Sequence, residues 1–204
     1  MSIDFDELKE KAKEKETMAK DKIAAAKENK KTASAMKALL DILPYFIVFI
    51  GVIIIVKALV ISSLITSGSM EPTLMTGDRA IYFRWAYINS EPERGDIIDF
   101  HYGDDVYSKR VIGTPGDFVQ FDSGYVYING EKISEPYIDD DVETNCLSSF
   151  IVPDDSYFVL GDNREDSYDS RFWDDPYVKR DDIMGKLLFN IPMHKLKYLE
   201  NFMF

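Results

Sequence analysis

Cysteine and histidine are almost missing from this chain, which contains one cysteine, Cys146, and two histidines, His101 and His194. A single cysteine cannot form an intrachain disulfide bond, so a disulfide-stapled fold is excluded, although an extracellular location is not. The sequence also lacks an H-E-x-x-H motif, a cluster of cysteines and histidines, and a calcium-loop pattern among its aspartates. We therefore expect neither a metal site nor a cofactor.

Positive charge is scarce in most of the chain. In total 24 Lys and Arg stand against 36 Asp and Glu, which gives a formal net charge of -12. Residues 1–41 are nearly balanced, with ten Lys and nine acidic residues, whereas residues 66–204 carry 13 basic and 27 acidic residues. Nucleic-acid binding depends on neutralising phosphates, so the acidic C-terminal part argues against a nucleic-acid partner.

A long apolar run extends from Ile42 to Ile65 and is interrupted by Lys57. The ammonium group of Lys57 can reach the lipid head groups while the following residues complete the helix, so we predict one transmembrane helix over residues 40–61. A buried core helix is the alternative, but the run has no polar face. A cleavable secretory signal is disfavoured because 41 charged residues precede the run, where such signals have a brief basic start.

The orientation of this span follows from its flanking positive charges. Five lysines lie within about 20 residues on the N-terminal side, whereas residues 62–85 on the other side hold only Arg79 and Arg84. We therefore expect residues 1–39 to form a charged, helical, cytoplasmic segment, either without a binding role or, less favoured, as a partner-binding segment. The C-terminal domain is expected outside the cytoplasm, next to membrane lipid.

Beyond the span, short runs rich in Val, Ile, Phe and Tyr alternate with Gly, Asp and Pro. They predict a mainly β, antiparallel β-sheet domain over residues 62–204, without a further boundary. Asn129-Gly130 is a strong hairpin signal. One helix is expected, near Ser69, with Pro72 in its first turn. The predicted strands cover residues 78–87, 96–102, 106–112, 118–121, 125–128 and 157–160.

Ser69 and Lys109 are candidate catalytic residues. A serine hydroxyl is a poor nucleophile until a base takes its proton, and an uncharged lysine amine can be that base. The pKa of a free lysine lies about 3.4 units above pH 7, so removing its proton at pH 7 costs roughly 4.6 kcal/mol. Burial must therefore lower this pKa. Val106, Tyr107, Val111 and Ile112 can form apolar walls around it if the strand is buried. The alternative for Lys109 is an edge-strand lysine that prevents aggregation.

Four sequence motifs in a fixed order surround these two residues. Together with the preceding apolar run, they resemble the conserved boxes of bacterial type I signal peptidases, and the resemblance covers roughly residues 42–192. The motifs are S-G-S-M-E-P-T-L (67–74), G-D-I-I-D-F (95–100), Y-S-K-R-V-I-G-T-P-G-D (107–117) and G-D-N-R-E-D-S-Y-D-S-R-F-W (161–173).

The resemblance assigns roles to individual residues. It implies that Ser69 is the nucleophile and Lys109 the general base. The hydroxyl of Ser67 would join the Ser69 backbone amide in an oxyanion hole, and Ser167 would orient the lysine amine. The matching substrate-binding positions, which line shallow apolar pockets, are Ile65, Met70, Leu74 and Tyr107. Those matching residues that maintain the geometry of the site are Asp162, Asp169 and Arg171.

Two positions depart from the family pattern. Asp174 follows Trp173 where a glycine is usual, and Ser108 stands where an aliphatic residue is common. The histidine that eukaryotic and archaeal relatives use as base is matched here by Lys109. His101 is therefore interpreted as a surface or packing residue.

The function implied is that of a membrane-bound serine endopeptidase using a Ser-Lys dyad. It would remove signal peptides with an A-x-A cleavage site from secretory preproteins at the bacterial cell membrane. A self-cleaving Ser-Lys protease of the SOS-repressor type is one alternative, although it would be soluble. A catalytically silent membrane-tethered binding module is another, although it should have lost Ser69 or Lys109.

Overall fold

The computed structural model describes residues 5–139 and 141–193, so His194 lies outside the described residues. The chain divides into two compact units, residues 1–55 and residues 56–204. The first unit is helical, and the second contains all of the strands.

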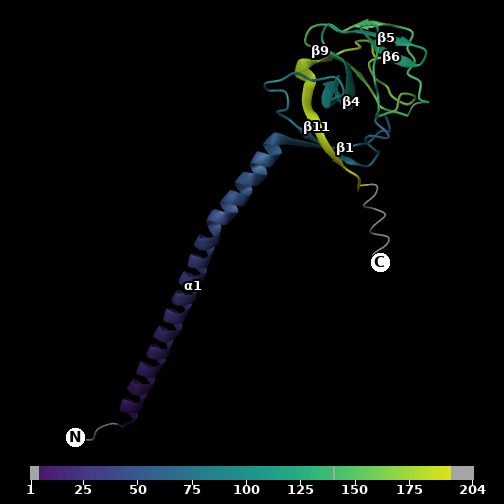
Figure 1. Ribbon diagram of the computed structural model, residues 1–204. Coiled ribbons are helices and arrows are strands. Elements are labelled where there is room, and N and C mark those ends of the chain that lie inside the picture. Colours follow the sequence, from purple (N-terminus) through teal and green to yellow (C-terminus); the bar gives the residue numbers. More distant parts are fainter. Residues whose placement is uncertain (1–4, 140, 194–204) are drawn as a thin grey trace, which may run out of the picture. The chain divides into compact units, whose positions relative to one another are not determined.

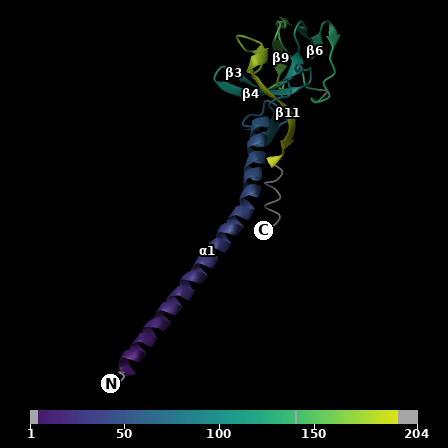
Figure 2. The same ribbon diagram turned by 90° about the vertical axis from the view of Figure 1, so that its left-hand side faces the viewer.

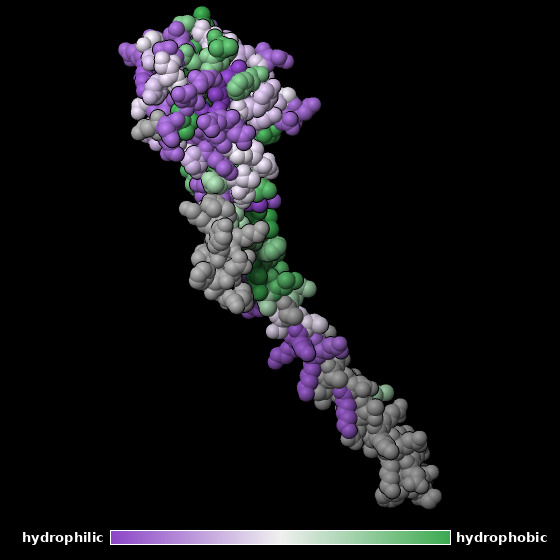
Figure 3. Space-filling view, turned by 90° about the vertical axis from the view of Figure 1, so that its right-hand side faces the viewer, coloured by the Kyte–Doolittle hydropathy of each residue, from purple (hydrophilic) through white to green (hydrophobic). Residues whose placement is uncertain are grey.

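Helix α1 (Phe5–Leu59) runs without a break through the charged segment and most of the apolar run, with Pro44 inside it. Its part from Lys30 to Leu59 is long and apolar enough to cross a membrane, and none of that stretch is buried. Figure 3 shows hydrophobic side chains gathered on this part of α1, with polar side chains on their N-terminal side. Val60 and Ile61, the last two residues of the predicted span, belong to a strand instead.

The larger sheet of the second unit has seven strands, and every neighbouring pair is antiparallel (Figures 1 and 2). Strands β3 and β4 carry the second and third sequence motifs side by side, because residues 97–102 pair with residues 105–110. The strands, in spatial order, are β1 (Val60–Leu64), β2 (Arg79–Phe83), β11 (Ile183–Ile191), β3 (Ile97–Tyr102), β4 (Asp105–Gly113), β9 (Ser156–Leu160) and β10 (Val178–Lys179).

A smaller antiparallel sheet has the order β7 (Glu131–Lys132), β6 (Tyr125–Ile128), β5 (Phe118–Asp122) and β8 (Phe150–Ile151). Asn129 and Gly130 join β6 to β7 with φ angles of 55° and 85°. Positive φ at both central residues is what a two-residue hairpin of type I′ requires, so the predicted hairpin is confirmed. A short 3-10 helix, η1 (Arg180–Asp182), precedes β11.

All six predicted strands are present, but β1, β8, β10 and β11 were not predicted, and the predicted helix near Ser69 is wrong. Residues 67–74 form turns instead, in which the backbone N–H of Glu71 donates to the Gly68 carbonyl at 3.0 Å. The Glu71–Pro72 peptide bond is cis. One bond of helical spacing is present, from the Leu74 N–H to the Met70 carbonyl at 2.8 Å, but it is not continued into a helix. The apolar side chains of Met70 and Leu74 pack into the core and fix the segment there.

Three apolar clusters hold the β unit together. One contains Phe100, Val111 and Trp173, and a second contains Ile112, Val119 and Phe158. The third lies under the first motif and consists of Ile65, Met70, Leu74, Ala80, Tyr82 and Ile97. Because its residues come from β2, β3 and the segment around Ser69, this third cluster fixes that segment against the larger sheet.

Candidate active site

Ser69 lies on the connection between β1 and β2, and that connection is anchored on both sides of it. The Ile65 N–H donates to the Asp78 carbonyl at 2.9 Å, and the Gly77 N–H donates to the Ile65 carbonyl at 2.8 Å. Met70 and Leu74 are almost fully buried in the third cluster. Ser69 itself remains partly accessible, and its hydroxyl lies 3.4 Å from the hydroxyl of Ser67.

Lys109 lies in β4 and is one of the most deeply buried charged residues of the described chain, with 1% of its surface exposed. Burial lowers the pKa of its amine from 10.5 to about 8, although Asp169 and Asp162 raise this pKa and Arg171 lowers it. The amine donates a hydrogen bond to the Ser167 hydroxyl at 3.0 Å. The contact between Lys109 and Ser167 is therefore present. Of the four residues expected to form walls around Lys109, Val111 and Ile112 are buried, whereas Val106 is exposed and Tyr107 is half-buried, because the first half of β4 has an open edge.

The fourth motif connects these two parts of the site. The backbone N–H of Asn163 donates to the Ser69 carbonyl at 3.1 Å, and its side-chain amide donates to the Gly68 carbonyl at 3.1 Å. A Cβ atom added to Gly161 would lie 2.1 Å from the Ser167 hydroxyl oxygen and 2.4 Å from the Ser69 carbonyl oxygen. The segment around Ser69 and the partner of Lys109 thus meet at Gly161.

Two buried ion pairs hold the segments that meet at Gly161. Arg110 donates two hydrogen bonds to Asp162, at 2.8 and 2.6 Å, and Thr73 donates a third. Arg171 donates to both carboxylate oxygens of Asp169, at 2.9 and 3.0 Å, while Asp169 also accepts the Gly161 N–H at 3.0 Å. Bidentate geometry fixes orientation as well as distance. The two pairs therefore position the third and fourth motifs around Lys109.

A cavity of about 650 Å³ opens beside Ser69. Among the described strands, β1 pairs with β2 alone, and β4 pairs with β9 only from Arg110 onward. Backbone edges of β1 and of the first half of β4 therefore border the cavity. Its lining includes five of the predicted site residues, namely Ile65, Ser67, Ser69, Met70 and Tyr107. Leu74 packs behind this wall in the third cluster.

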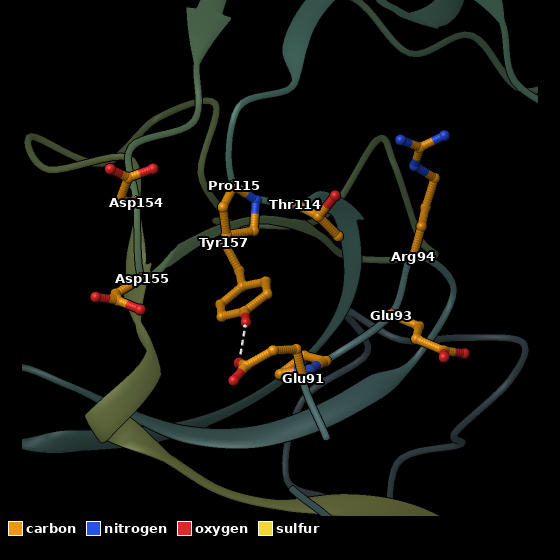
Figure 4. A pocket seen from close by; sticks show the side chains of 9 residues that line it. Glu91, Glu93, Arg94, Thr114, Pro115, Asp154, Asp155 and Tyr157 are labelled. Carbon is orange, nitrogen blue, oxygen red and sulfur yellow. Dashed lines mark hydrogen bonds between the residues drawn. The ribbon is translucent and has the colours of Figure 1, made fainter. Parts of the chain in front are cut away.

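Another cavity, of about 750 Å³, contains none of the predicted site residues (Figure 4). Its acidic wall is structurally engaged, because Glu91 accepts hydrogen bonds from Tyr157 at 2.8 Å and from Arg180 at 2.9 Å. The cavity next to Ser69 is therefore the better candidate for an active site, although it is slightly smaller.

The structure brings most of the predicted residues into one region but leaves one contact open. Within residues 5–139 and 141–193, no hydrogen bond joins the Ser69 hydroxyl to the Lys109 amine. Catalytic hydrogen bonds are often long before substrate binds. His101 is exposed at the surface, as predicted.

Sequence reasoning gave no role to Gly161 or Asn163, although both lie in the fourth motif. It also gave none to Thr73, in the first motif. Motif membership was the one available signal, since their contacts are made with distant parts of the chain.

Comparisons with known proteins identify the family of this chain. The family model described as signal peptidase, peptidase S26, matches residues 38–191. A probable signal peptidase I-2 from Synechocystis sp. is 42% identical over 130 residues, which cover 60% of this chain and 58% of that protein. A signal peptidase I from Leptolyngbya laminosa is 41% identical over 143 residues, covering 65% and 69%.

A third relative is matched over more of its length. Signal peptidase IB from Staphylococcus aureus is 34% identical over 182 residues, covering 79% of this chain and 94% of that protein. A crystal structure of a signal peptidase I from Enterococcus faecalis is 33% identical, covers 48% of this chain and 97% of that one, and has a TM-score of 0.41. The family model matches most of this chain, and the Staphylococcus relative is aligned over nearly its whole length. The chain therefore belongs to the S26 family of signal peptidases, which are serine endopeptidases.

Proposed function

We propose that this chain is a membrane-anchored endopeptidase that removes N-terminal signal peptides from exported preproteins with Ser69 as nucleophile and Lys109 as general base. The observation that carries the proposal is the buried Lys109 amine, whose pKa is lowered to about 8 and which is oriented by Ser167. A buried lysine of this kind has a functional rationale, because perturbed pKa values are concentrated at catalytic sites.

In the first half of the reaction, the uncharged Lys109 amine takes the proton of the Ser69 hydroxyl as its oxygen attacks the scissile carbonyl carbon. The negative charge that develops on the carbonyl oxygen would be stabilised by the Ser69 backbone N–H and the Ser67 hydroxyl. Lys109 then gives its proton to the leaving amine, the C–N bond breaks, and the signal peptide remains bound to Ser69 as an ester.

In the second half, Lys109 takes a proton from water, whose oxygen attacks the ester carbonyl. The Ser69–acyl bond breaks, and Ser69 regains its proton from the lysine. Lys109 thus acts alternately as base and acid. Ser167 holds the amine in place throughout, and the two buried ion pairs fix the geometry of both motifs.

The substrate would enter as an extended strand between the free edges of β1 and β4, since strand addition to an exposed edge is a common mode of peptide recognition. Small residues one and three positions before the cut, the A-x-A pattern, would face the pockets formed by Ile65, Met70, Leu74 and Tyr107. Residues near 40–60 would span the membrane, with residues 1–39 in the cytoplasm and the β unit outside it, near the bilayer that carries the signal peptide.

Cleavage of a secretory preprotein by the detergent-solubilised full chain tests this proposal. Mass spectrometry of the new N-terminus should place the cut directly after an A-x-A sequence. Ser69→Ala, Lys109→Ala and Lys109→Arg should each remove nearly all activity, since arginine cannot deprotonate and a general base contributes a factor of about 100 to 10,000.

Exposed residues of the same types provide matched controls. Ser148→Ala and Lys179→Arg make the same chemical changes away from the site and should leave the rate unchanged. More than about a tenth of normal activity in a folded Lys109→Arg variant, set against that usual factor for a general base, would rule out Lys109 as the base.

A further inference from the structure

A buried carboxylate lies in the wall of the cavity beside Ser69. Asp99 is 1% exposed, and one of its oxygens accepts a hydrogen bond from Ser108 and the other from Ser63, both at 3.0 Å. Tyr82 in turn donates to the Ser108 hydroxyl at 2.7 Å. Burial raises the pKa of the Asp99 carboxyl, while the two serine hydroxyls and His101 lower it in part.

This network presents hydrogen-bond acceptors to the cavity. A serine hydroxyl has one proton, and both Ser63 and Ser108 donate theirs to Asp99. Toward the cavity, each serine oxygen can therefore only accept a hydrogen bond. Asp105 is a second carboxylate in the lining, and the lining contains no lysine, arginine or histidine. Within the described chain, Asp99 forms no ion pair.

The network is separate from the Lys109 site. Asp99 pairs with Ser108 across β3 and β4, whereas Lys109 pairs with Ile98, so the two pairs lie on opposite faces of the sheet. The charges that shift the pKa of Lys109 come from Asp169, Arg171 and Asp162, and Asp99 is not among them. The acceptor wall is therefore free to serve substrate recognition.

Strand geometry gives the position of the substrate residue that would meet this wall. Ser63 and Ile65 lie two residues apart, and side chains two apart along an extended chain face the same side. If the substrate runs parallel to β1 and its residue before the cut meets Ile65, then the residue that meets Ser63 is the third before the cut. A pocket lined by carboxylates and hydrogen-bond acceptors favours a side chain that is positively charged and donates hydrogen bonds.

We propose that Asp99, Ser63 and Ser108 form a specificity subsite that favours a positively charged side chain, lysine or arginine, at the third position before the cleaved bond. The inference rests on the proposed signal-peptide cleavage and keeps the alanine directly before the cut, but it revises the A-x-A pattern at the third position, where it expects a basic residue to be preferred to alanine. The ammonium or guanidinium group would donate hydrogen bonds to the serine oxygens and supply the ion-pair partner that Asp99 lacks among the described residues.

The test uses the full chain in detergent and three peptides made from one preprotein cleavage region. All have alanine directly before the cut and differ only at the third position, which is lysine, alanine or glutamate. The kcat/KM for the lysine peptide should exceed that for the alanine peptide by about tenfold, and the glutamate peptide should be cut more slowly than both. Asp99→Asn should bring the lysine-to-alanine ratio close to one.

Asp104→Asn is the matched control, because it removes the same charge from an exposed position outside the cavity lining and should leave the ratio unchanged. The wild-type peptide series decides by itself if the buried Asp99 variant does not fold. Cleavage of all three peptides with alanine equal to or better than lysine would overturn the subsite and leave the proposed function intact. Cleavage of none would reject the proposed function, and the subsite with it.

Discussion

At the scale of single residues, the electrostatic balance around Lys109 determines when it can act as a base. Burial lowers its pKa, but Asp169 and Asp162 lie close enough to raise it again, and the result is about 8. With this pKa, about a tenth of the lysine is uncharged at pH 7 and about half at pH 8. The site is therefore expected to work with a partly protonated base near neutrality.

The lowered pKa of Lys109 determines in which direction kcat/KM changes with pH and over which pH range. Because the free enzyme must lose the proton of Lys109 before it can react, activity should rise with pH, about tenfold per unit well below pH 8, and level off above it. Rates from about pH 6 to 9.5 on a peptide without groups titrating there would measure this, with unfolding followed in parallel. A profile that falls with increasing pH between about 6 and 8 would exclude an uncharged lysine as the base.

Sequence reasoning reached part of this picture. It required the pKa of the lysine to fall by about 3.4, to near 7, where half of the amine is uncharged at pH 7, and it attributed this fall to burial, which is the first cause found here. It had no means to include Asp162 and Asp169, because their proximity to Lys109 is set by the packing of β4 against the fourth motif. Spacing along the chain does not contain that distance.

At the scale of structural elements, the fourth motif acts as a clamp between the Ser69 segment and Lys109. Gly161 is the point of closest approach, where even one additional carbon atom would overlap with Ser167 and with the Ser69 backbone. Real Cβ contacts do not reach such distances, and the neighbours are held by buried hydrogen bonds, so the added atom must displace a part of the site.

Gly161→Ala should therefore reduce kcat far more than it reduces folding. Displacements of about 1 Å at a catalytic site can cost a factor of about 100 in rate. Overpacking typically costs about 1 to 3 kcal/mol of stability. Steady-state kinetics and thermal unfolding of the same sample separate the two effects. Activity within about twofold of the wild type in the folded variant, against that hundredfold expectation, would show that Gly161 does not set the geometry of the site.

The elements themselves were predictable to different degrees. Strands β2 to β6 and β9 have the Val, Ile, Phe and Tyr content of local β signals, and the Asn129-Gly130 turn has only a few possible geometries. Strand β11 was missed because it is defined by pairing with β2 and β3, roughly a hundred residues earlier in the chain. The turn at Ser69 was mistaken for a helix because Pro72 suits either structure when packing is unknown.

At the scale of the whole molecule, the chain combines an acidic β unit with a helix whose exposed side chains are apolar over most of residues 42–56. Exposed Ile, Val and Phe on consecutive turns are costly in water, and a bilayer removes that cost. The lysines concentrate before this stretch, and basic residues beside a span favour the cytoplasmic side. A single crossing would thus place the two ends of the chain on opposite sides of the membrane.

Protease added to intact spheroplasts should therefore digest an epitope at the C-terminus and spare one at the N-terminus. The physical reason is the retention of the lysine-rich flank in the cytoplasm, whereas the acidic β unit crosses without a comparable barrier. Immunoblotting of both epitopes gives the result, and lysis with detergent before protease treatment is the control in which both must disappear. Protection of the C-terminal epitope with loss of the N-terminal one would reverse the orientation, and protection of both would place the chain in the cytoplasm.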